Sequence, residues 1–112
     1  HNSLGLLYSS QGFYSRAIES FAAAISLNQN YSSPYINRGV IFFNKGLYQK
    51  ALFDFTRAIE IEPSSSKALL NRANVYSEIG AKEAVCEDLK KLCNLGNCNS
   101  LDNLISTGYC QY

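Results

Sequence analysis

The sequence predicts an all-α protein built from three stacked helix–turn–helix units and a C-terminal capping helix. Apolar residues recur at helical spacing throughout the chain, and no segment shows the sustained alternation of a strand. Seven identities also recur at one fixed offset: Gly5/Gly39, Gly12/Gly46, Tyr14/Tyr48, Ala17/Ala51, Phe21/Phe55, Ala24/Ala58 and Ile25/Ile59. This period matches a helix–turn–helix unit of about 34 residues. Such a unit cannot bury its apolar face alone, so successive units must stack as a superhelix and share one core.

Helical periodicity and turn residues together predict seven helices, at residues 1–11, 14–28, 33–45, 48–61, 66–79, 82–94 and 99–108. The first helix of each unit ends before a glycine, at Gly12, Gly46 and Gly80, which can adopt the left-handed conformation that ends a helix. Asn28–Asn30 separate the first two units. The segment 62–66 contains Pro63 and separates the next two, and a serine there can cap the helix that follows.

These elements form one domain over residues 1–112, with units at about 1–31, 32–65 and 66–97 and a capping helix at about 99–110. The third unit follows the repeat through Ala73, Tyr76 and Gly80. We then expect a one-residue deletion that brings Ala84 into register, which leaves Asp88 where a large apolar residue belongs. Leu101, Leu104 and Ile105 give the last segment a helical apolar face that covers the end of the stack.

Composition and charge disfavour several classes of function. Ten basic and nine acidic residues leave a net charge of +1, which is no footprint for nucleic acid or an anionic membrane. No apolar run approaches the ~20 residues that span a bilayer, so no membrane insertion is expected. The single histidine is His1, and the chain has no glycine-rich phosphate loop and no paired carboxylates at a site. We therefore expect no enzyme activity, no catalytic residues, no metal and no cofactor.

The second unit reads Tyr35-x2-Arg38-Gly39-x2-Phe42, then Gly46, Ala51-x3-Phe55, Ala58 and Pro63. This pattern resembles the tetratricopeptide repeat. The first unit matches at Leu4, Gly5, Tyr8, Ala17, Phe21 and Ala24, and the resemblance extends to about position 85. The cysteine-containing segment 87–98 looks like the closing stretch of bacterial repeat proteins of this type.

The resemblance implies a scaffold whose first helices line a concave groove that binds a peptide or partner segment. Three ladders, each spaced by the same period, would face this groove: Ser3/Asn37/Asn71, Leu6/Val40/Asn74 and Ser10/Asn44/Glu78. Flanking positions are Ile36, Phe43, Lys67 and Leu70, and Tyr35 is a further aromatic candidate.

Asn37 and Asn71 are the strongest candidates because an amide can both donate to and accept from a peptide backbone. The alternative is that they, with Arg38 and Arg72, only bond across the helix stack.

Some members of the resembled family hold a free C-terminal carboxylate with a clamp of Lys, Asn, Asn, Lys and Arg. This chain matches that clamp only at Asn37 and Lys67, whereas Asn2, Leu6 and Asn71 depart from it. Loss of two of three cations removes most of the charge-assisted pairing, so we expect no recognition of this kind.

Four cysteines, Cys86, Cys93, Cys98 and Cys110, fall in the last quarter of the chain. Their spacing lacks a C-x2-C pair, so a zinc site is a poor match. If the last two helices form an antiparallel hairpin, Cys86 faces Cys110 and Cys93 faces Cys98. Such disulfides would imply a periplasmic or secretory compartment. The alternative is four reduced, half-buried thiols in a cytoplasmic protein.

A second hypothesis for the function is structural. The chain would oligomerise through exposed ends of the stack, such as the first helix, or through convex aromatic residues such as Tyr14, Tyr48 and Phe53. The two hypotheses predict different partners: a foreign peptide, or another copy of the chain.

Overall fold

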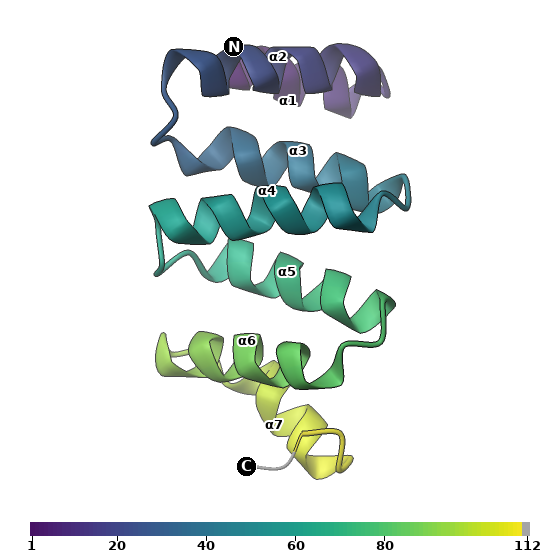
Figure 1. Ribbon diagram of the computed structural model, residues 1–112, viewed down its shortest axis with the longest axis vertical. Coiled ribbons are helices and arrows are strands. Elements are labelled where there is room, and N and C mark those ends of the chain that lie inside the picture. Colours follow the sequence, from purple (N-terminus) through teal and green to yellow (C-terminus); the bar gives the residue numbers. More distant parts are fainter. Residues whose placement is uncertain (111–112) are drawn as a thin grey trace.

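The computed structural model describes residues 1–110, which form seven helices and no strands. The helices stack in chain order along the long axis, from α1 and α2 at one end to α7 at the other (Figure 1). Each begins and ends within two residues of its expected position: α1 Asn2–Ser10, α2 Tyr14–Leu27, α3 Ser32–Asn44, α4 Tyr48–Ile61, α5 Ser66–Glu78, α6 Lys82–Asn94 and α7 Asn99–Ser106.

Consecutive helices pack against one another along the whole stack. In addition, α1 contacts α3 and α3 contacts α5, so the first helices of the three units form one continuous layer. The second helices α2, α4 and α6 pack on this layer and bury the repeated small and aromatic residues. This is the helical repeat architecture that the period of the sequence predicts.

A glycine on the first helix of a unit faces a large ring on the second. Gly39 packs so closely on Phe55 that a Cβ atom would lie 2.6 Å from Cε1 of the ring, and Gly5 approaches Phe21 in the same way. The third unit has Ala73 and Leu89 at the equivalent positions, and both are buried in one cluster. The extra methyl group of the alanine is thus matched by a smaller partner side chain.

The turns repeat as closely as the helices do. Gly12, Gly46 and Gly80 have φ values of +81°, +76° and +78° and end the first helices as expected. The amide of the residue after each glycine returns to a carbonyl in the last turn of the helix, as from Leu47 N to Phe42 O at 2.8 Å. Ser65 caps α5, because its hydroxyl oxygen accepts a hydrogen bond from the amide of Ala68 at 3.3 Å.

The deletion expected near Ala84 is wrong. Helices α4 and α6 begin at Tyr48 and Lys82, which are one full period apart, so the register of the repeat is unbroken. In this register Asp88 is equivalent to Asp54, and Leu89 takes the large apolar position. Asp88 is thus a repeated position of the second helix, and its partner lies on another helix.

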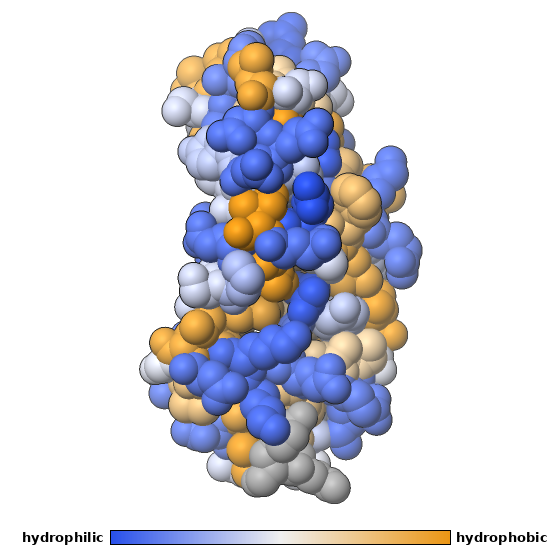
Figure 2. Space-filling view, turned by 60° about the vertical axis from the view of Figure 1, so that its left-hand side comes forward, coloured by the Kyte–Doolittle hydropathy of each residue, from blue (hydrophilic) through white to orange (hydrophobic). Residues whose placement is uncertain are grey.

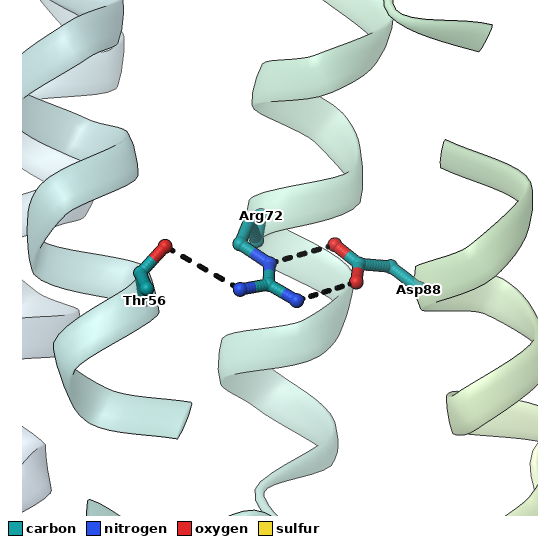
Figure 3. Close-up of polar contacts among 3 residues, drawn as sticks. All are labelled: Thr56, Arg72 and Asp88. Atoms are coloured by element: carbon teal, nitrogen blue, oxygen red, sulfur yellow. Dashed lines mark hydrogen bonds and ion pairs between the residues drawn. The ribbon is translucent and has the colours of Figure 1, made fainter. Parts of the chain in front are cut away.

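That partner is Arg72, which forms a two-pronged ion pair with Asp88 at 2.8 and 2.6 Å (Figure 3). The same arginine donates to the hydroxyl of Thr56 on α4 at 3.4 Å, so it connects α4, α5 and α6. One unit earlier, Arg38 pairs with Asp54 at 2.9 and 2.7 Å. Buried carboxylates require this pairing, which adds directional contacts to the apolar stack.

The pKa values of the Arg38–Asp54 pair reflect its environment. Burial raises the pKa of the Asp54 carboxyl, and the hydrogen bond from Arg38 opposes this effect. The hydrogen bond to Asp54 raises the pKa of Arg38 in turn. Arg38 therefore stays charged at any ordinary pH, and its guanidinium group is occupied by the ion pair with Asp54.

Two disulfides close the C-terminal end, and both pairings are as expected. Cys86 is bonded to Cys110 with a Cα–Cα distance of 5.7 Å, and Cys93 to Cys98 with 4.0 Å. The alternative of four reduced thiols is therefore wrong for this structure. Helix α7 is steeply inclined to α6 in Figure 1 rather than laid along it as a hairpin, and among the helices of residues 1–110 its backbone comes close only to that of α6.

Candidate peptide-binding surface

Two hollows lie along the layer of first helices. The first, of about 410 Å³, lies between the starts of α3 and α5; we call it the α3–α5 hollow. The second, of about 270 Å³, lies among α5, α6 and α7; we call it the α5–α7 cleft. Figure 2 shows one face of the stack, on which an apolar patch lies near the middle and a second apolar band runs along the right-hand side, with hydrophilic residues between and around them.

The lining of the α3–α5 hollow is mainly polar, and its charges balance. Among the described residues it contains one cation, Lys67, and one anion, Glu62, whose carboxylate accepts a hydrogen bond from Ser32 at 3.4 Å. The two clamp-like residues, Asn37 and Lys67, both line it. The hollow therefore has the two matching positions of the carboxylate clamp but no excess of positive charge.

Asn37 is half-buried in a polar network that joins α1 to α3. Its amide nitrogen donates to Asn2 Oδ1 at 3.1 Å and to Ser33 Oγ at 3.5 Å. Asn2 donates in turn to Ser33 Oγ and to the hydroxyl of Tyr31, both at 3.3 Å. Asn37 is thus hydrogen-bonded within the chain, to Asn2 and Ser33. Within residues 1–110 its side chain has no hydrogen bond to an arginine.

Asn71, its equivalent one unit later, is in a different situation. The position that corresponds to Ser33 is occupied by Lys67, and the one that corresponds to Asn2 is occupied by Ile36. Within residues 1–110 the structure shows no hydrogen bond from the Asn71 side chain, which is half-buried. The Asn71 amide is therefore unbonded within residues 1–110, whereas the amide nitrogen of Asn37 already donates to Asn2 and Ser33.

The other candidate residues divide by exposure. Val40 is half-buried, and the exposed members of the set are Ser3, Leu6, Ser10, Asn44, Lys67, Leu70, Asn74 and Glu78. Three aromatic or apolar candidates also pack in the core, and one of them, Ile36, lines the α3–α5 hollow as well. Ile36 and Tyr35 are buried, because both pack in the central apolar cluster. Phe43 is half-buried and packs on Tyr48, with a centroid distance of 5.6 Å.

Sequence reasoning missed two sets of lining residues. Ser33 lines the α3–α5 hollow, and its place one period before Lys67 pointed to it. Ser100, Asn103 and Leu104 of α7 line the α5–α7 cleft. Ser100 lies one period after Ser66 and Leu104 one period after Leu70, so the period pointed to these two residues but not to Asn103.

The described part of the chain offers neither a metal-binding cluster nor a membrane-spanning helix. Residues 1–110 contain no group of three or more His, Cys, Asp or Glu side chains arranged to hold a metal ion. None of the helices in that range has the length and apolar character needed to cross a membrane.

Comparison with known proteins identifies the family. Two sequence profiles of the tetratricopeptide repeat match, one at residues 1–31 and one at residues 33–65, and together they cover more than half of the chain. The chain belongs to the tetratricopeptide repeat family. No curated protein sequence matches it.

Solved structures of tetratricopeptide repeat domains share the fold. The second domain of Spaghetti (RPAP3), bound to the HSP90 peptide SRMEEVD, is 26% identical with a TM-score of 0.79, over 84% of this chain and 87% of that one. The first domain of Spaghetti (RPAP3), bound to the same peptide, is 20% identical with a TM-score of 0.84, over 94% and 85%. The Arabidopsis OM64 domain is 24% identical with a TM-score of 0.78, over 85% and 78%.

The contrast between the two asparagines predicts different effects on stability. Asn37→Ala removes hydrogen bonds to two side chains and should lower the free energy of unfolding by about 1 kcal/mol. Asn71→Ala removes no such bond and should change it by less than about 0.5 kcal/mol. Urea denaturation of both variants measures this, and equal losses would contradict the different roles of the two residues.

Proposed function

We propose that this protein is a non-enzymatic interaction scaffold that holds a peptide segment of a partner protein against the layer formed by α1, α3 and α5. Two of the similar structures are bound to a peptide, which supports this class of function. In this chain the same layer presents exposed side chains from all three first helices. Peptide binding by such a surface needs no catalytic group and no cofactor.

The observation that carries the proposal is the pair of amides on α5. Asn71 and Asn74 are three positions apart, so their side chains lie on one side of the helix. Asn74 is exposed at the α5–α7 cleft, and Asn71 has no hydrogen bond within residues 1–110. Two amides that each offer donors and an acceptor suit the backbone of an extended peptide.

The charges of the surface favour the peptide backbone over a terminal carboxylate. Among the described residues, Lys67 is the only cation that lines the α3–α5 hollow, and Glu62 lies in the same hollow. The three remaining clamp positions hold Asn2, Leu6 and Asn71, which carry no charge. A carboxylate would find one cation and a competing anion, so we propose that the bound segment is internal or that its terminus makes no essential contact.

A test of this function starts from a random peptide library with amidated C-termini, selected on the intact disulfide-bonded protein. The N71A/N74A double variant should bind the selected peptides about fivefold or more weakly, because each lost hydrogen bond contributes about 0.5–1.5 kcal/mol. Asn94→Ala, at the exposed end of α6, serves as the matched control and should leave affinity unchanged.

Isothermal titration calorimetry of these variants gives the affinities. Equal affinity in all variants, or equal loss in the control, would show that α5 is not the contact surface. If the amidated library gives no binders and the same library with free C-termini does, the proposed preference for the peptide backbone is contradicted.

A second candidate function, self-association, is favoured by one exposed apolar position on α1. Leu7 is 52% exposed, whereas its equivalents are buried: Ile41 at 2% by Phe21 and Ala17 of the preceding unit, and Val75 at 0% in the central cluster. The outer side of α1 thus presents an apolar residue that other units cover, and a second copy of the chain would cover it by pairing α1 with α1.

Light scattering over a concentration series tests this association. The protein should dimerise, and Leu7→Lys should return it to a monomer, because a charge would be buried without a partner. Phe53→Lys, on the exposed side of α4, tests the alternative contact through convex aromatics. A strict monomer at millimolar concentration would end the self-association hypothesis.

A further inference from the structure

We propose that the α5–α7 cleft is a specificity pocket that takes one bulky apolar side chain, of the size of leucine or phenylalanine, from the bound peptide. This inference rests on the proposed function and adds to it the class of side chain that the surface selects. It assigns α7 a part in binding, beyond that of a cover for the end of the stack.

The cleft arises because α7 departs from the geometry of the repeat. The backbones of α1 and α3, and of α3 and α5, approach one another closely, but within residues 1–110 those of α5 and α7 do not, and the two helices share only side-chain packing in the C-terminal cluster. In Figure 1, α7 follows α6 and runs away from the stack at a steep inclination. The side of α5 that a further first helix would cover is therefore left open.

Leu70 is less well covered than the equivalent residue of the preceding unit. Its equivalent one unit earlier, Ile36 on α3, is 6% exposed and packs in a cluster that includes Ala68 of α5, the next first helix. Leu70 has no such cover among the described residues and is 38% exposed. Ile36 is buried because the next first helix lies over it, whereas α7 leaves the equivalent side of Leu70 partly open. An apolar side chain of a bound peptide would cover this exposed part of Leu70.

The residues that line the cleft also favour an apolar side chain over a charged one. Its apolar wall combines all three helices, and its polar members are amides and hydroxyls: Leu70, Ala73, Val85, Leu89 and Leu104, with Asn74, Ser77, Ser100 and Asn103. None of these nine residues carries a charge, so a charged side chain would lose its hydration without gaining a partner. The amides can bond the peptide backbone that carries the apolar side chain.

The size of the cleft agrees with one large side chain. Its volume is about 270 Å³, which exceeds the ~150 Å³ apolar cavity known to hold a benzene molecule. The wall contributed by α7 is fixed at both ends, because Cys98 directly precedes the helix and Cys110 lies shortly after it, and each is bonded to α6. The disulfides therefore hold the cleft open at a defined width.

The probe for this test is N-acetyl-leucinamide, with N-acetyl-glycinamide and N-acetyl-lysinamide as controls, followed by NMR chemical shifts of the intact disulfide-bonded protein. Only the leucine compound should give saturable shifts, and these should fall on the amides of Ala73, Asn74, Val85 and Asn103. Because the probe has no extended peptide chain, it reports on the cleft regardless of whether the peptide-binding proposal holds.

Leu70→Ser should weaken binding of the leucine probe about threefold to tenfold, since part of the apolar wall is lost. Leu47→Ser, at the α3–α4 turn and 42% exposed, is the matched control and should leave binding unchanged. Shifts outside the cleft, equal shifts with all three probes, or no saturable shift would overturn the specificity pocket. Selected peptides that bind without such a result would leave the scaffold function standing by itself.

Discussion

The close approach of a glycine to an aromatic ring within each of the first two units is the constraint on which the remaining structure depends. Gly39 leaves no room for a methyl group beside Phe55, and Gly5 faces Phe21 in the same way. This contact sets how closely the two helices of a unit can pack. In the third unit, Ala73 is larger than the glycine of the earlier units and Leu89 is smaller than their phenylalanine, so the two helices still fit together. One spacing is thereby maintained through three units, and regular stacking follows from it.

Regular stacking in turn places the candidate binding surface. Because α1, α3 and α5 contact one another, their exposed side chains form one layer on which Asn71, Asn74 and Leu70 lie together. The buried pairs Arg38–Asp54 and Arg72–Asp88 join the helices of a unit, and Arg72 also reaches the preceding unit through Thr56. Such pairs add little net stability compared with apolar residues but restrict which stacking register is compatible with paired charges. The surface is thus held by the same contacts that form the core.

Most of the fold could be predicted from the sequence, because one period repeats helices, turns and core residues together. The disulfide pairing was predicted correctly, although the antiparallel hairpin from which it was argued is not formed. Asp88 was wrongly placed because the expected deletion shifted the register by one residue, although Asp88 lies one period after Asp54 just as Arg72 lies one period after Arg38. The period places the start of α7 about one repeat after the start of α5 but could not predict that α7 is steeply inclined, so the α5–α7 cleft was missed. Nor could it show that Asn37 is engaged and Asn71 is not, since the difference lies in their neighbours, Asn2 and Ser33 against Ile36 and Lys67.

The most direct test of this account is a double-mutant cycle on Gly39 and Phe55, measured by chemical denaturation. Gly39→Ala alone should lower the free energy of unfolding by about 1–3 kcal/mol, because the new methyl group collides with the ring. Combined with Phe55→Leu, which reproduces the Ala73–Leu89 arrangement, the same substitution should cost at least about 1 kcal/mol less. Additive losses within about 0.5 kcal/mol would contradict the claim that this contact sets the spacing of the helices.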